Sequence, residues 1–263
     1  MPRSISTTAL ICALVCASAR SAYAYRPFDL TDAAVAGPRE MELECGPFGY
    51  IVDANGRSLV VPSAILNFGI AEDWEIVIEG RSFFLLHSDD SRRYTLRDTA
   101  LSVKHVLRRG TLQERGGPSV GLEVGLLLPG VAIDSGVGAS FAGLLSQRWP
   151  SFAVHVNGTL EITHDHRLAG VGGAILEGPS RWNVRPVAEF VFGQDQEPTV
   201  SGLVGAIWKV RDNISLDAGW RIARTGSDGE REFRAGFTWG IPLGPGSSAR
   251  PALRSPIPFG ALT

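Results

Sequence analysis

The chain has 263 residues, and its 25 Lys and Arg against 27 Asp and Glu give a formal net charge of −2. This balance excludes the basic profile of a nucleic-acid-binding protein, and we expect no nucleic-acid partner. The mean hydropathy of +0.08 is high for a soluble protein. Beyond the N-terminal region, no apolar run reaches the roughly 18 residues of a membrane-spanning helix. A closed β-barrel in an outer membrane would account for both features.

Residues 1–24 have the layout of a secretory signal peptide. Arg3 provides a positive start, residues 9–17 form an apolar run without charge, and Ala22-Tyr23-Ala24 has the small-x-small form of a cleavage site. We therefore expect cleavage near Ala24 and localisation in a bacterial outer membrane. The chain beyond this point keeps a single cysteine, Cys45, which excludes an intramolecular disulfide.

Three parts follow the signal peptide. Residues 25–38 lack strand patterning, and we expect them either in the periplasm or folded into a pore. Residues 39–243 carry the alternation of a β-barrel, whereas 244–263 are rich in Gly, Pro and Ser, which is typical of a flexible tail. The fold class predicted is all-β, a single transmembrane antiparallel barrel of about 12 strands. These strands are expected at 39–46, 58–68, 74–86, 97–108, 118–129, 137–148, 152–163, 169–178, 183–193, 199–209, 213–223 and 231–241.

Side-chain parity supports these strands. In 152–163, the polar His155 and Asn157 alternate with Val154, Val156 and Leu160. Such segments of about ten residues suit tilted strands that cross a bilayer, with one face toward lipid and the other toward the interior. An even number of strands returns both ends of the barrel to one side.

The connections give a second indication of the topology. If the ends of the barrel are periplasmic, every second connection should be a short turn, as at 71–74, 149–151 and 210–213. Longer loops are expected at the other end, at 46–57, 87–95, 129–136, 193–198 and 225–232. The short segment 163–167 is an exception to this alternation.

Four tryptophans lie beside the short turns. They are Trp74, Trp149, Trp182 and Trp208. An indole ring has an apolar body and one N–H donor, so it prefers the headgroup boundary of a bilayer. We expect these four side chains to form part of a membrane-interface girdle. The alternative is that each packs into a soluble core, which gives no reason for their position at alternate turns.

Polar residues of inward parity form the candidate lumen lining. They are Glu75, Glu79, Lys104, Glu123, Arg148, His155, Asn157, Glu161, Arg185, Glu189, Lys209, Asp217, Arg221 and Arg234. A charge on the lipid face would cost about 2–4 kcal/mol at the midplane, which favours the interior for all of them. They would either line a polar channel that selects a solute or form a salt-bridge network that fills a narrow barrel.

Other clusters of reactive side chains are weaker candidates. His164, Asp165 and His166 could hold a metal ion, but in an extended segment the aspartate faces away from the two histidines, so a solvated loop is favoured. Acidic outer loops such as 88–90 could bind calcium or bridge to lipopolysaccharide, but solvated loop charge is the favoured explanation. His87 and Ser88 are neighbours whose side chains diverge on a strand. We expect no cofactor, no metal and no enzymatic activity.

Three motifs resemble one known family. They are Gly69-Ile70-Ala71-Glu72-Asp73-Trp74-Glu75, the segment 97–105 with His105 at its end, and the strand end 120–130 with Pro129-Gly130. In order and spacing they are similar to the "MetA-pathway of phenol degradation" outer-membrane proteins. The resemblance covers about residues 40–243 and implies a barrel that passes hydrophobic or aromatic compounds.

Three functions remain open from the sequence. The first is a passive outer-membrane channel for small molecules, hydrophobic or aromatic ones among them, with outer-membrane lipids and lipopolysaccharide as its surroundings. The second is a structural or surface-interaction barrel whose ion pairs close the lumen. The third is a soluble periplasmic β-sandwich or lipocalin-like carrier, in which the apolar faces would pack inward.

Overall fold

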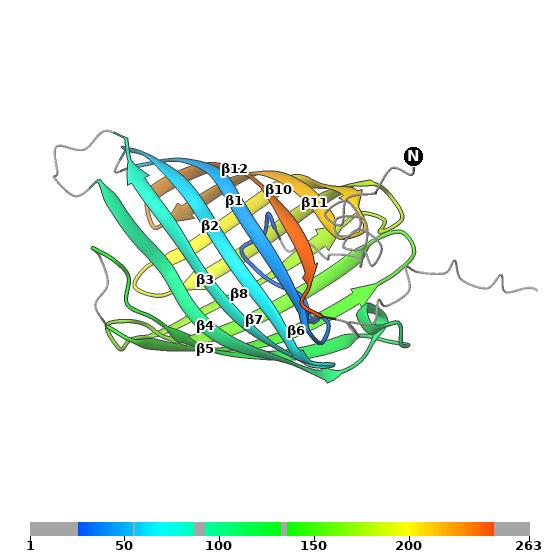
Figure 1. Ribbon diagram of the computed structural model, residues 1–263. Helices are drawn as coiled ribbons and strands as arrows, with labels where there is room; N and C mark the ends of the chain where they lie inside the picture. The colour runs from blue at the N-terminus through cyan, green and yellow to red at the C-terminus, as the bar shows by residue number, and fades with distance from the viewer. Residues whose placement is uncertain (1–25, 55, 87–92, 133–135, 245–263) are drawn as a thin grey trace, which may run out of the picture.

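The computed structural model describes residues 26–54, 56–86, 93–132 and 136–244, and these form one closed antiparallel barrel (Figure 1). Each strand pairs with the next in sequence, and β12 pairs with β1. The strands are β1 (Glu40–Asp53), β2 (Gly56–Ala71), β3 (Trp74–Leu85), β4 (Tyr94–Arg108), β5 (Ser119–Leu127), β6 (Gly138–Arg148), β7 (Ala153–Ile162), β8 (Leu168–Glu177), β9 (Val184–Gln194), β10 (Pro198–Arg211), β11 (Ile214–Thr225) and β12 (Asp228–Pro242). The predicted fold class, a 12-stranded all-β barrel, is confirmed.

Closure removes the free edges of the sheet. The ladder between β1 and β12 runs from Glu40↔Pro242 to Val52↔Arg231, so the first and last strands are joined over most of their length. A strand edge in hydrocarbon would leave backbone N–H and C=O groups without partners, at several kcal/mol each. The closed ladder is therefore what allows these strands to cross a membrane.

The two faces of the barrel wall differ in polarity. On β7, His155 is 1% and Asn157 6% exposed, whereas the alternating Val156 and Leu160 are 44% and 60% exposed. The same alternation places Phe141 and Leu216 on the outside. An apolar exterior around a polar interior is the arrangement expected in lipid, and it is opposite to that of a soluble sandwich or carrier.

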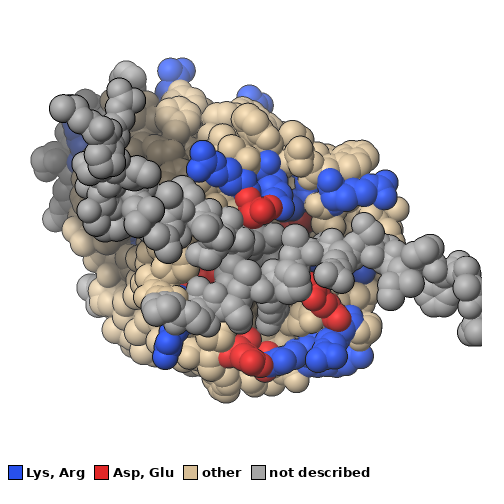
Figure 2. All heavy atoms as spheres, turned by 45° about the vertical axis from the view of Figure 1, so that its right-hand side comes forward, with Lys and Arg blue, Asp and Glu red and all other residues tan. Residues whose placement is uncertain are grey.

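Both ends of the barrel chain meet at one end of the barrel, named here the terminal end. The N–H of Leu243 donates to the carbonyl of Arg39 at 2.8 Å. A three-residue 3-10 helix, η1 (Thr111–Gln113), lies between β4 and β5 at this end. Figure 2 looks obliquely toward it, and charged side chains gather at this end, whereas the flank consists mostly of other residues.

Two predicted loops are wrong. The segment 46–57 belongs largely to β1, which continues to Asp53, and most of 225–232 belongs to β12, which begins at Asp228. In β1 a bulge between Cys45 and Phe48 changes the parity, so that Glu44 and then Gly49 face inward. The polar residues at the start of β12 pair with β1 and β11. They lie beyond the part of the strand whose outer face is apolar, so the alternation did not reveal them.

Some sequence predictions concern residues that lie outside the described part of the chain. They include the signal peptide at 1–24, nearly all of the tail at 244–263, His87 with Ser88, and the acidic segment 88–90. Among the described residues, no helix is long and apolar enough to cross a membrane.

Candidate functional site in the barrel lumen

Residues 26–39, named here the luminal segment, lie inside the barrel (the blue loop in Figure 1). The segment enters from β1 at the terminal end and contacts side chains from strands all around the wall. Arg26, Phe28, Asp32 and Ala33 are buried, with Ala33 fully inaccessible. The interior at this level is therefore occupied by the chain's own residues.

Asp29 holds the segment against β11 and β12. Its Oδ2 lies 2.7 Å from the Arg221 Nε, and its Oδ1 lies 2.6 Å from the Arg234 Nη1. The Arg234 Nη1 also donates to the carbonyl of Pro27 at 2.9 Å. Two guanidinium groups therefore converge on one carboxylate: Arg234 forms a charge-assisted hydrogen bond with it, and Arg221 adds an ion pair.

Glu189 on β9 binds the next part of the segment. Its Oε1 accepts the N–H of Asp29 at 3.0 Å and the N–H of Leu30 at 2.8 Å. A carboxylate that accepts two backbone N–H groups fixes the path of the chain as well as its charge. The backbone on both sides of Phe28 is therefore positioned by charged side chains of the barrel.

Asn157 and Lys104 hold Thr31 and Asp32. The N–H of Thr31 donates to the Asn157 Oδ1 at 2.8 Å, and the Asn157 Nδ2 donates back to the Thr31 carbonyl at 2.8 Å. The Lys104 Nζ donates to the Thr31 Oγ1 at 3.1 Å, and it lies 3.8 Å from Asp32 and 3.4 Å from Glu75. Burial raises the pKa of Asp32 to about 7, although the nearby Lys104 ammonium opposes this shift.

Residues 33–36 of the luminal segment are fixed by η1 and by side chains of β3 and β6. The Gln113 Nε2 donates to the carbonyl of Ala33 at 2.8 Å, and the N–H of Ala33 donates to the Ser146 Oγ at 3.0 Å. The N–H of Ala36 donates to the Glu75 Oε2 at 2.6 Å. The connection between β4 and β5 thus closes over the segment from the terminal end.

The far end of the segment approaches glycines of the wall. The Arg26 Nη1 donates to the Ser63 Oγ at 2.6 Å, and its Nε lies 3.6 Å from Asp217. A Cβ at Gly236 would collide with the Arg26 guanidinium, and one at Gly219 would come within 3.1 Å of the Pro27 ring. Close approach of the segment therefore depends on the missing side chains at these two positions.

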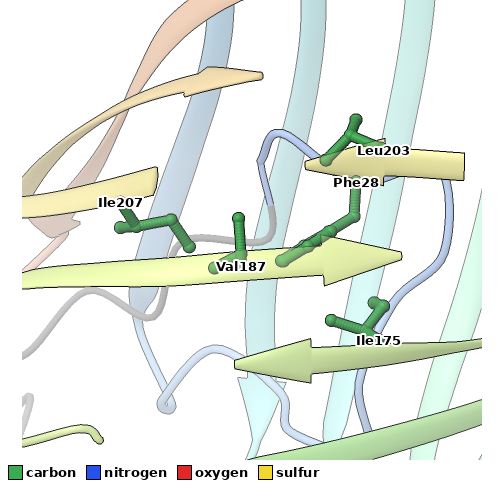
Figure 3. Close-up of a cluster of buried hydrophobic side chains, with 5 residues drawn as sticks. All are labelled: Phe28, Ile175, Val187, Leu203 and Ile207. Carbon is green, nitrogen blue, oxygen red and sulfur yellow. The ribbon is translucent and has the colours of Figure 1, made fainter. Parts of the chain in front are cut away.

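One part of the lumen wall is apolar. Ile175 on β8, Val187 on β9, and Leu203 and Ile207 on β10 are between 1% and 5% exposed, and we name them the apolar wall. Phe28 and these four side chains form one buried hydrophobic cluster, with Leu30 packed against it. In Figure 3 the Phe28 ring points from the luminal segment toward this group. The wall is unusual because the interiors of such barrels are generally polar.

The predicted lumen residues fall into two groups. Glu75, Lys104, Asn157, Glu189, Asp217, Arg221 and Arg234 contact the luminal segment, as described above. Several of the other predicted residues contact neighbouring residues of the barrel or of η1 instead. Arg185 lies 3.4 Å from Glu177, Lys209 lies 2.8 Å from Asp212 near the terminal end, and the Arg148 N–H donates to Thr111. Glu79 shares the inward parity but is exposed, and Glu123 and Glu161 are half-buried. That these residues line a solute path remains a prediction.

Sequence reasoning missed several residues of the site. Arg26, Asp29 and Asp32 come from the segment itself, and Glu232 pairs with Arg81 at 2.9 Å on the inner face. Glu40 and Glu44, before the bulge of β1, are also buried. The alternation of Glu40, Glu42 and Glu44 was a signal that could have placed them inside.

His155 has a serine and a glutamate beside it. The Ser146 Oγ lies 2.8 Å from the His155 Nδ1, and the Glu177 Oε1 lies 3.7 Å from its Nε2. Ser146 and His155 are directly opposite each other on β6 and β7. Ser146 is inaccessible and accepts the N–H of Ala33, so this group anchors the luminal segment.

The residues of the candidate metal loop have other contacts. The His164 Nε2 lies 3.0 Å from the Leu128 carbonyl, and Asp165 lies 2.9 Å from Arg167. The Thr163 hydroxyl donates to Asp165 at 2.6 Å, and this hydrogen bond lowers the pKa of that carboxyl. Within the described ranges, no three His, Cys, Asp or Glu side chains are grouped to hold a metal ion.

The four tryptophans all lie on the outside near the terminal end. Trp74, Trp149, Trp182 and Trp208 are between 42% and 51% exposed. Trp74 stacks on His105 with 3.9 Å between ring centroids, and Trp149 stacks on Phe152 at 4.7 Å. Trp239, which was not predicted, lies near the same end of β12. Their role as a membrane-interface girdle remains a prediction.

Comparison with known proteins supports the fold. No protein-family model and no curated protein match the chain. An outer membrane channel from Pseudomonas putida F1 matches with a TM-score of 0.55 at 12% identity, covering 83% of this chain and 99% of that one. The KdgM porin gives 0.49 at 8% identity, covering 76% and 98%, and the CymD monoaromatic hydrocarbon channel gives 0.44 at 12%, covering 78% and 89%. The first likeness shows an outer-membrane barrel fold.

Proposed function

We propose that this chain is a passive outer-membrane channel for small molecules, including hydrophobic or aromatic ones, and that the luminal segment closes it at rest. The observation that carries the proposal is the interior of the barrel. It combines an apolar wall at Ile175, Val187, Leu203 and Ile207 with a segment held by hydrogen bonds and ion pairs. An apolar surface within a polar lumen can bind the apolar part of a solute once the segment leaves it.

The exterior supports the membrane location. Large apolar side chains such as Phe141, Leu160 and Val204 are more than half exposed on the outer face. Outer-membrane lipids would cover them, with lipopolysaccharide on the outer leaflet, after cleavage of the signal peptide near Ala24. The resemblance to the "MetA-pathway of phenol degradation" proteins and the fold of the P. putida channel both favour a channel over a catalytic role.

Transport would proceed without an energy source. A solute enters from the end opposite the terminal end and reaches the luminal segment. The segment moves aside, exchanging its contacts with the wall for contacts with water. Because the ladders continue around the whole barrel, passage along the lumen requires no break in strand pairing, unlike a sideways exit.

A permanently closed barrel is the second candidate. The observation that favours it is the number of strands that the luminal segment joins, from Glu75 on β3 to Arg234 on β12. In this case the segment would act as an internal brace, and the barrel would serve a structural or surface-interaction role.

Solute uptake decides between these two functions. Cells that lack the gene would be compared with cells that carry it, using radiolabelled toluene and an uncharged sugar of similar size. We expect faster uptake of toluene in cells with the protein. Equal rates for both solutes in both strains would contradict the channel and leave the closed barrel.

A further inference from the structure

The barrel positions Phe28 through contacts to the backbone on both sides of this residue. Arg234 binds the carbonyl of Pro27 at 2.9 Å, on one side of the phenylalanine. Glu189 binds the N–H of Asp29 at 3.0 Å and that of Leu30 at 2.8 Å, on the other. The ring itself contributes nothing to these polar contacts, so they fix where it points without filling the space it occupies.

The walls of this site suit a single aromatic ring. Ile175 and Ile207 are each 1% exposed, Leu203 2% and Val187 5%, and they come from three neighbouring strands. All four side chains are branched aliphatic groups; in Figure 3 Leu203, Val187 and Ile175 lie around the Phe28 ring, and Ile207 lies beyond Val187. A site of this kind binds by burial of apolar surface and by shape, and it gives no advantage to a charged ligand.

We infer that the site occupied by Phe28 binds one unsubstituted or alkyl-substituted aromatic ring of a solute, and that Phe28 is its built-in competitor. This inference rests on the proposed function and names its solute class. A benzene-type solute replaces the Phe28 ring on the apolar wall, so the apolar surface stays covered when the luminal segment leaves. A polar solute offers no such replacement and leaves the wall exposed to water.

Replacing Phe28 with alanine gives the first test. The polar contacts around Phe28 remain, while the lost ring leaves an apolar space, and apolar cavities of about 150 Å³ in proteins are known to stay dry and take up benzene. Binding of fluorobenzene would be measured by fluorine NMR on the full-length protein in lipid nanodiscs. We expect Phe28→Ala to bind fluorobenzene at least about tenfold more tightly than the wild type, because its site is vacant.

Matched variants separate this site from lipid. Phe141→Ala removes the same ring from an outward position that is 53% exposed, and it should bind no more fluorobenzene than the wild type. Adding Leu203→Phe to Phe28→Ala refills the space and should abolish the gain. Equal binding by Phe28→Ala, Phe141→Ala and the wild type, with all three folded by heat-modifiable gel mobility, would overturn the inference.

A second measurement needs no cavity and no loss of stability. With 4-fluorophenylalanine at position 28, the fluorine signal reports whether the ring is on the wall or in water. Added benzene should move this signal toward that of an exposed ring, and added glucose should not. An unchanged signal up to the solubility of benzene would overturn the role of Phe28 as a competitor.

These outcomes are distinguishable from failure of the proposed function. If Phe28→Ala binds fluorobenzene but cells with the protein take up toluene no faster, the site stands and the channel fails. If uptake depends on the protein but no variant gains binding, the channel stands and this solute site fails.

Discussion

The lumen wall formed by β1–β4 and the wall formed by β8–β10 contact the luminal segment in different ways. On the first, buried Glu75 and Lys104 bind the backbone of Ala36 and the hydroxyl of Thr31. On the second, aliphatic side chains cluster with Phe28, although Glu189 on β9 also binds the backbone of Asp29 and Leu30. Polar contacts of the first kind fix the position of the segment, whereas the apolar wall presents a surface that a solute of similar shape can cover. Changes on the two sides should therefore separate closure from solute choice.

The largest effect is expected from Asp29→Ala. The change removes a charge-assisted hydrogen bond and an ion pair from the segment, which should weaken its docking by about 3 kcal/mol, while Arg221 keeps Glu230 and Arg234 keeps Glu232 as partners. Reaction of a cysteine placed at Ala33, in a Cys45→Ser background, with a water-soluble thiol reagent measures this opening. Asp212→Ala, which breaks a pair with Lys209 near the terminal end, is the control and should leave labelling slow. Slow labelling in both variants would show that Asp29 does not hold the segment.

A smaller effect is expected from Asn157→Ala. It removes both hydrogen bonds to Thr31 and leaves the backbone N–H and C=O of that residue without these partners, at about 2 kcal/mol. Thr159→Ala lies two residues further along the inner face of β7 and provides the matched comparison. The same thiol labelling should accelerate for Asn157→Ala and not for Thr159→Ala. If the two behave alike, the contact at Thr31 does not contribute to closure.

On the outer face, Trp74→Ala should cost about 1 kcal/mol of barrel stability. The change removes the stacking on His105 at 3.9 Å and an interfacial indole. Urea unfolding in lipid bilayers measures the loss, and the conductance of the folded protein should be unchanged. A conductance as high as that of a variant that lacks residues 26–38 would show that residues on the outer face also control closure.

Lys209→Gln should have the smallest effect. Its pair with Asp212 is partly exposed, with side chains that are 33% and 55% accessible. Such a pair contributes about 0.5 kcal/mol or less. Unfolding and conductance should therefore match those of the wild type, and a large change in either would mean that this charge belongs to the site after all.

Much of the fold follows from side-chain parity. On β7, His155 and Asn157 alternate with Val156 and Leu160, and in a chain without apolar spans this alternation requires a closed sheet. The strand ends were less predictable. A bulge at Cys45–Phe48 and polar residues at the start of β12 continue the ladder where the alternation of apolar residues stops.

The site was only partly predictable, for a physical reason. Arg221 and Arg234 could be placed inside by parity, but their partner Asp29 lies in a segment without periodicity, 205 residues before Arg234. Ser146 could have been found from strand pairing, since it is opposite His155 in an adjacent strand. The position of Phe28 could not, because it depends on backbone contacts that form only when the barrel is closed.

Single-channel conductance in planar bilayers tests the central claim most directly, with the wild type compared against a variant that lacks residues 26–38. The account predicts that the wild type is closed for most of the recording and that the shortened chain conducts continuously. If the two chains give the same conductance, the luminal segment does not close the barrel.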